Sequence, residues 1–212
     1  NASIKQKKQD GNYFDSFIGL DFFYDKRNQK YQTTSGFFSN YNVNLPILSD
    51  TNTLTNSYNY KIFKELYENN VSTFSFSFQG ASSLSGDDIK LSERLYIPGR
   101  RLRGFESGKI GPKDGSDYIG GNYVSTINAT TTIPKILENV QSVDIVMFAD
   151  AANIWGVDYD DSLDKNGIRS SIGVGLDWLT PVGPLTFSFA QPITKEPSDI
   201  EETFRFNIGT SF

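Results

Sequence analysis

The sequence predicts an all-β fold of about nine antiparallel strands, the C-terminal half of an outer-membrane transmembrane β-barrel. Apolar and polar residues alternate along most of the chain, and no apolar run approaches the roughly 18 residues that a spanning helix needs. Only alternate side chains of a barrel strand meet lipid, so a chain that is 37% hydrophobic can still cross a membrane with strands. The 17 Phe and 11 Tyr suit strands and the interfacial girdles of a barrel, although a soluble β-sandwich would also use them.

The first four strands follow from this alternation and from the turns between them. Strands are expected near residues 13–24, 32–44 and 57–66, separated by a charged turn at 25–28 and a polar loop at 49–53. After a turn at 68–70 comes the clearest alternation, with phenylalanines on one face and polar residues on the other: Phe74, Phe76 and Phe78 against Thr73, Ser75, Ser77 and Gln79. The first two strands are long for a globular protein and suit tilted spanning strands.

The alternation then stops for a long segment, residues 82–118. A compact domain rarely contains so long a segment without periodicity unless the segment has a function. Strands resume near 119–133, 143–155, 168–179, 185–190 and 202–212. The resulting number of strands is odd, whereas single-chain bacterial barrels are even, so the chain is expected to be half of a barrel. It begins at Asn1 without a signal peptide, and the odd number favours a piece of a longer protein over a processed one.

The last expected strand identifies the compartment. Its residues alternate between an apolar and a polar face: Phe204, Phe206, Ile208 and Phe212 against Arg205, Asn207, Gly209 and Ser211. A strand that ends the chain on an aromatic residue at a membrane interface is usual for the closing strand of an outer-membrane barrel. We therefore expect the chain to lie in an outer membrane.

The composition excludes several classes of function. Without cysteine and histidine the chain has no disulfide framework, no Ser-His-Asp triad, no imidazole proton shuttle and no ordinary zinc site. We therefore expect neither an enzyme nor a metal or other cofactor. The net charge of −5 and the lack of a long basic run give no sign of nucleic-acid binding. Asp144 and Asp150 do not form a catalytic pair, because their spacing along one strand separates them by roughly 20 Å.

Motifs in the long segment and in the last strands resemble those of a known family. The segment contains Tyr96-Ile97-Pro98-Gly99-Arg100-Arg101-Leu102-Arg103-Gly104-Phe105, then Ile110-Gly111-Pro112 and Gly120-Gly121-Asn122. Further along come Thr180-Pro181-Val182-Gly183-Pro184-Leu185, Phe187-Ser188-Phe189-Ala190-Gln191-Pro192 and Phe204-Arg205-Phe206-Asn207-Ile208-Gly209. In this order the motifs closely resemble the BamA family of outer-membrane protein assembly factors (bacterial surface antigens), over essentially the whole chain.

The resemblance implies how the chain is organised. Residues 1–212 would be the C-terminal part of a barrel of about 16 strands, with residues 82–118 as a long loop that folds into the lumen. The N-terminal POTRA domains and the first strands of such a barrel are expected to be absent from this chain.

The candidate site is a contact between the loop and the barrel wall. The permanent charge of Arg103 needs an acceptor if the loop enters the lumen. Asp150 shares a strand face with Asp144, which would be poorly placed against lipid, so this face should point to the lumen. In the resembling family the loop motif is Leu102, Arg103, Gly104 and Phe105, and its partners are Phe148 and Asp150 of a Phe-x-Asp motif.

Two details of the site follow from single positions. Gly104 fits a sharp loop tip, and Phe105 is expected to pack against the inner wall. In the resembling family, a glutamate often stands where this chain has Thr130. Arg103 is thus left with one acidic partner, which predicts a weaker attachment of the loop to the barrel wall.

The function that the resemblance implies is the folding and insertion of client outer-membrane proteins through a lateral gate, without chemistry. The gate would involve the closing strand, specifically Phe204, Phe206, Asn207, Ile208, Gly209 and Phe212. Implied partners are the outer-membrane bilayer with its lipopolysaccharide, client proteins and accessory lipoproteins of the assembly complex in a Gram-negative bacterium. The alternatives are a TamA-like or two-partner secretion transporter and a passive porin, which would keep its lumen open.

Overall fold

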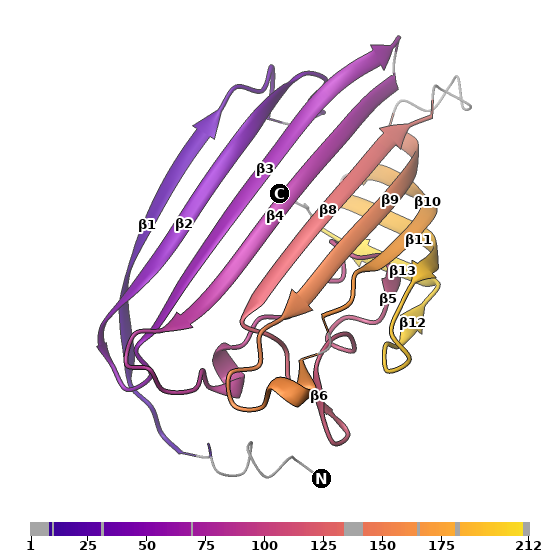
Figure 1. Cartoon of the computed structure of the whole chain (residues 1–212). Helices are drawn as coiled ribbons and strands as arrows, with labels where there is room; N and C mark the ends of the chain where they lie inside the picture. The colour runs from indigo at the N-terminus through magenta and orange to yellow at the C-terminus, as the bar shows by residue number, and fades with distance from the viewer. Residues whose placement is uncertain are drawn as a thin grey trace.

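The structure consists mainly of one curved, antiparallel sheet. The computed structural model describes residues 9, 11–30, 32–68, 70–133, 142–164, 166–180 and 183–209. Nine strands lie in the order β1-β2-β3-β4-β8-β9-β10-β11-β13, so the predicted all-β fold and strand number are confirmed (Figure 1). The strands are β1 Asp15–Asp25, β2 Gly36–Ser49, β3 Thr53–Tyr67, β4 Asn70–Ser83, β8 Tyr123–Thr132, β9 Val143–Trp155, β10 Arg169–Thr180, β11 Gly183–Thr194 and β13 Phe204–Ile208.

The remaining elements are short. They are the 3₁₀ turns η1 Leu91–Glu93 and η2 Asp161–Leu163, and the two-residue strands β5 Gly104–Phe105, β6 Lys113–Asp114, β7 Asp117–Tyr118 and β12 Glu201–Glu202. β5 pairs with β12, and β6 pairs with β7. In the part of the chain that the structure describes, no helix has the length and apolar character needed to span a bilayer.

Strand ends differ from those that the alternation predicts. β11 continues through Gln191 to Thr194, because its ladder with β10 extends past the last alternating residue. The closing strand is shorter than expected and ends at Ile208, since Gly209 has φ +118°, which does not continue a β ladder. Gly209 is therefore not part of the closing strand, and Phe212 lies outside the described residues.

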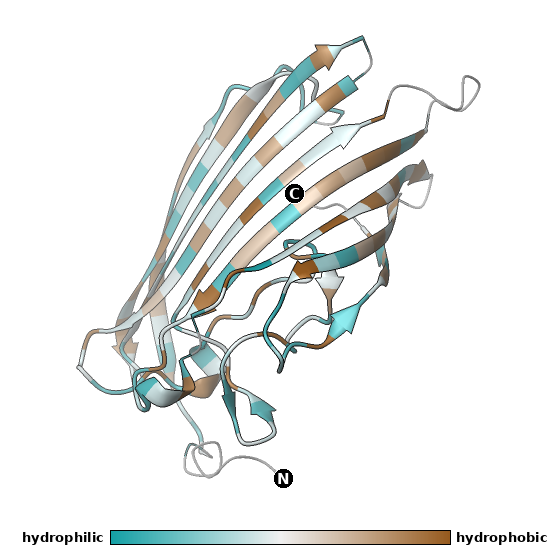
Figure 2. Cartoon of the chain, turned by 45° about the vertical axis from the view of Figure 1, so that its right-hand side comes forward, coloured by the Kyte–Doolittle hydropathy of each residue, from teal (hydrophilic) through white to brown (hydrophobic). Residues whose placement is uncertain are grey.

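The two faces of the sheet differ as the alternation predicts. On β9, the inward residues Val146, Phe148 and Asp150 are at most 5% exposed, whereas Met147 on the opposite face is 52% exposed. Figure 2 shows the corresponding alternation of hydrophobic and hydrophilic bands along the strands. The face of Asp150 is thus the concave one.

An aromatic group lies on the outward face near one end of the strands. The rings of Phe78, Tyr123 and Trp155 contact one another across three neighbouring strands, with centroids 5.7–6.4 Å apart. Aromatic residues at this height are typical of the girdles that a barrel places at a membrane interface.

The long loop, residues 84–122 between β4 and β8, lies in the concavity of the sheet (Figure 1). Its apolar side chains and those of the inner wall form the hydrophobic cluster of the molecule. This cluster consists of Ile97, Leu102, Phe105 and Ile110 from the loop with Val124, Ala152 and Ile154 from β8 and β9. The loop therefore supplies the second layer that a single sheet needs to bury its inner face.

A pair of lysine substitutions tests the assignment of the two faces. Leu20 points outward from β1 and is 43% exposed, whereas its neighbour Asp21 points inward. In the full-length protein in lipid vesicles, Leu20→Lys should lower the free energy of unfolding by about 2–4 kcal/mol, because it places a charge in lipid. Asp21→Lys should cost clearly less. Equal losses in urea titrations would show that the faces are assigned wrongly.

Candidate functional site

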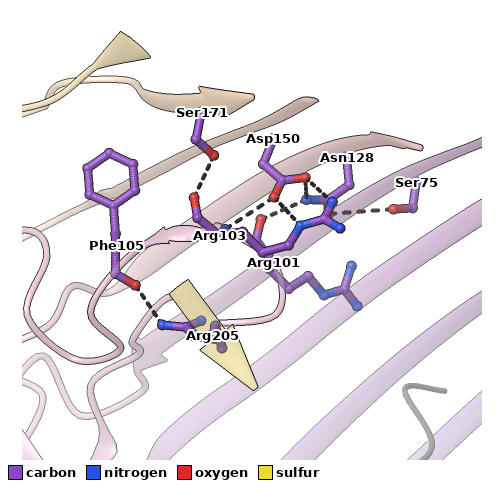
Figure 3. Close-up of polar contacts among 8 residues, drawn as sticks. All are labelled: Ser75, Arg101, Arg103, Phe105, Asn128, Asp150, Ser171 and Arg205. Carbon is purple, nitrogen blue, oxygen red and sulfur yellow. Dashed lines mark hydrogen bonds and ion pairs between the residues drawn. The ribbon is translucent and has the colours of Figure 1, made fainter. Parts of the chain in front are cut away.

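Arg103 and Asp150 form a two-pronged ion pair between the long loop and β9 (Figure 3). The Arg103 Nε donates to Asp150 Oδ2 at 2.7 Å, and Nη2 donates to Oδ1 at 2.7 Å. The backbone N–H of Arg103 also donates to Oδ2, at 3.1 Å. The Asp150 side chain is fully buried and that of Arg103 is 14% exposed. Because both charges are largely removed from water, each is compensated mainly by the other. The contact expected from the sequence is therefore present.

The ring of Phe148 stacks against the guanidinium of Arg103. Its position two residues before Asp150 places it on the same face of β9. The guanidinium carbon of Arg103 lies 3.4 Å from the centroid of the Phe148 ring, a close cation–π contact. Phe148 and Asp150 thus hold one group, Phe148 by its ring face and Asp150 by its oxygens.

Asn128 is the partner that the sequence analysis missed. It pairs directly with Asp150 across β8 and β9, and its Nδ2 donates to Asp150 Oδ1 at 2.8 Å. The same amide donates to the backbone carbonyl of Arg101 at 2.7 Å. Thr130, which lies two residues further along β8, pairs with Phe148 instead. Only the register of the two strands identifies Asn128, and alternation alone does not give that register.

Arg101 binds the loop to a second strand of the sheet. Its Nη2 donates to Asn59 Oδ1 of β3 at 2.7 Å. Burial lowers the pKa of Arg101, and the neighbouring charge of Arg100 lowers it further. The loop connects β4 to β8, and its motif is therefore bound to the next strand on each side, β3 through Arg101 and β9 through Arg103.

The other motif residues fit closely against the wall. Leu102 and Phe105 are completely buried, as expected for Phe105. Gly104 has φ +91°, and a Cβ there would lie 3.2 Å from the Ala190 Cβ and 3.3 Å from the Ser171 Cβ. Ser171 follows a register shift in β10 and donates to the Arg103 carbonyl at 2.5 Å. Both the backbone conformation and the lack of space thus favour glycine at this position.

Among the described residues of the closing strand, Arg205 is the side chain that hydrogen-bonds to the tip of the loop. Arg205 points inward, and its Nη2 donates to the Phe105 carbonyl at 2.6 Å. Phe204, Phe206 and Ile208 are exposed, with their side chains on the outward face. Asn207, on the inward face, is also exposed. The described part of the expected gate segment therefore does not touch the ion pair.

A second buried ion pair holds the connection between β11 and β13. Arg169 and Asp199 have fully buried side chains, with Arg169 Nε donating to Asp199 Oδ2 at 2.9 Å. Asp199 Oδ1 also accepts from the backbone N–H of Gly111 in the long loop, at 3.3 Å. This connection and the loop are consequently fixed to each other.

Comparison with known proteins places this geometry among relatives. A model of the Omp85 superfamily domain matches residues 1–212. The chain is 30% identical over 174 residues to the outer membrane protein assembly factor BamA of Neisseria meningitidis serogroup B, covering 66% of this chain and 22% of that protein. It is 27% identical over 219 residues to BamA of Nitratidesulfovibrio vulgaris, covering 97% and 27% respectively. A SAM50-like protein of Schizosaccharomyces pombe is 30% identical over 141 residues, covering 61% and 29%.

A solved structure shares the fold. The crystal structure of BamA from Haemophilus ducreyi lacking POTRA domains 1–3 matches with a TM-score of 0.80 and 28% identity. The match covers 89% of this chain and 41% of that chain. This chain covers only 22–29% of the lengths of the three curated relatives named above.

Removal of the Asp150 charge tests the energetic weight of the ion pair. In the full-length protein, Asp150→Asn leaves the Arg103 guanidinium buried without an anion and should lower the free energy of unfolding by about 3–5 kcal/mol. Urea titration in lipid vesicles measures it. The control is Asp21→Asn, an exposed carboxylate on the inward face of β1, which should cost far less. If Asp150→Asn lowered the free energy of unfolding as little as the control does, the ion pair would contribute little to stability.

Two glycine substitutions separate backbone strain from crowding. Gly104→Ala should cost about 1–3 kcal/mol through its left-handed φ alone, and more because of the contacts to Ala190 and Ser171. Gly108 has φ +74°, but a Cβ at that position would have nothing within 4 Å, so Gly108→Ala carries the backbone strain only. Protease cleavage within the long loop should rise more for Gly104→Ala. Equal cleavage would argue against close packing of the loop tip.

Proposed function

Because this chain belongs to the Omp85 superfamily, we propose that it forms the C-terminal part of the barrel of an outer-membrane protein assembly factor. Such a protein folds client outer-membrane proteins and inserts them into the membrane. The observation that carries the proposal is the loop motif held by Arg103 and Asp150 inside the concave face of a barrel-like sheet.

The closing strand supports a role at a gate. Its ladder with β11 has five residue pairs, Leu185–Phe189 against Ile208–Phe204, in the described residues. The neighbouring β10 and β11 pair over eleven positions. A short ladder holds this strand less firmly in the sheet, so its pairing with the first strand of the full barrel would open more easily. The free strand edge can then pair with an incoming strand of a client. In this mechanism no covalent bond is made or broken, so we propose no catalytic step.

The proposed surroundings follow from the proposed function. The outward face would meet the bilayer of a Gram-negative outer membrane, including lipopolysaccharide and phospholipid. Client barrels would be the substrates, and lipoproteins of the assembly complex would be the accessory partners. The described residues give no contact site for any of these lipoproteins.

Two other functions remain as alternatives of different kinds. A TamA-like or two-partner secretion transporter would share the loop motif, and the domains that precede the barrel in the full-length protein distinguish it. A passive porin needs an open lumen, whereas here the loop fills part of the concave side with buried apolar residues. Steady, large ion conductance of the full-length protein in a planar bilayer, without an assembly defect on depletion, would favour the porin.

Substitution of Arg103 tests the assembly role. In cells depleted of the wild-type protein, full-length Arg103→Ala should reduce the level of folded client barrels, because the loop loses its anchor to Asp150. Arg103→Lys keeps the charge but lacks the two-pronged geometry, so it should restore assembly only in part. Folded and unfolded clients are separated by heat-modifiable mobility on gels.

The control for this experiment is the exposed Arg100, which lies three residues earlier in the same loop. Arg100→Ala should leave client assembly near the wild-type level. Normal client levels in Arg103→Ala cells, together with a loop that has become sensitive to protease, would separate the loop anchor from the assembly function and contradict the proposal.

A further inference from the structure

The side chain of Arg205 connects the closing strand to the tip of the long loop. It is 9% exposed, although it lies on the last described strand of the sheet. Its Nη2 donates to the Phe105 carbonyl at 2.6 Å, and its Nε donates to Glu202 Oε2 at 2.8 Å. A permanent charge is therefore buried between two segments that lie about a hundred positions apart in the sequence.

The guanidinium of Arg205 occupies the space that a side chain at Gly99 would fill. A Cβ at position 99 would lie 1.9 Å from the Nη1 of Arg205 and 2.6 Å from its Cζ. Nη1 has no hydrogen-bond partner among the described residues. A side chain at position 99 would therefore displace the guanidinium from the place where its bonds to the Phe105 carbonyl and to Glu202 hold it.

The backbone connects the same two segments. β12 pairs with β5, with Glu202 opposite Gly104 and Glu201 opposite Phe105. The N–H of Glu106 donates to the Ile200 carbonyl at 2.8 Å. The residues that lead into the closing strand are therefore paired with the loop tip just before Arg205 contacts it.

We propose that Arg205 and Gly99 form a latch through which the long loop holds the closing strand in place. Arg103 and Asp150 fix the loop to β9, and the latch transmits that fixed position to β13. The closing strand then changes its position in the sheet only when the guanidinium moves off Gly99. This inference rests on the proposed function, since it assigns to the loop the control of the gate strand.

The test measures hydrogen exchange of the peptide that contains residues 204–208, in the full-length protein in lipid vesicles. Arg205→Gln and Gly99→Ala should each accelerate exchange roughly ten-fold or more, because each removes the same charge-assisted contact. The double variant should exchange no faster than Arg205→Gln alone, since an added methyl group at position 99 has no guanidinium to displace. Heat-modifiable mobility verifies that each variant is folded.

Arg100→Gln is the matched control, because it removes one positive charge from an exposed position of the same loop. It should leave the exchange of residues 204–208 unchanged. Unchanged exchange in Gly99→Ala, or additive effects in the double variant, would overturn the latch. Hydrogen exchange is measured without a client, so the latch and the proposed function can fail separately. If the variants release the closing strand as expected but client assembly stays normal, the latch stands and the proposed function is contradicted.

Discussion

The pairing of Arg103 with Asp150 is the constraint on which the arrangement of the molecule depends. A carboxylate on the inner face of a strand and a guanidinium in a loop are both costly to bury, and each is acceptable only because the other lies beside it. Their contact fixes where the loop tip lies. Leu102 and Phe105, on either side of Arg103 in the chain, are then carried into apolar contact with the wall.

The loop and the sheet consequently depend on each other for stability. A lone sheet leaves its concave face unburied, and a loop of this length has little regular structure of its own. Together they form a cluster in which the loop contributes Ile97 and Ile110 and the wall contributes Val124 and Ile154. The polar contacts at Asp150 and Asp199 fix the loop at Arg103 and at Gly111, and so give it one orientation.

The extent to which the sequence predicts this structure differs between its levels. Alternation with a period of two identifies the strands and their faces, so the inward direction of Asp150 could be derived from its strand alone. The position of the loop could not, because nothing periodic marks residues 82–118, and only the resemblance of the motif indicated the lumen. Asn128 was missed because the register between β8 and β9 depends on a connection that alternation does not describe. The contact of Arg205 with Gly99 depends on the path of two irregular segments.

The sequence separation of the loop contacts has a consequence for the order of folding. Arg103 and Asp150 are 47 positions apart, and Phe105 and Arg205 are 100 apart. The entropy lost on closing such long segments is recovered only when the contacts form, so distant contacts are slow to appear. β8 and β9 must therefore be paired before the loop tip has a place to dock, and β13 must follow before Arg205 can reach the loop. The interior of this sheet is consequently filled late, by a segment that precedes β8 and β9 in the chain.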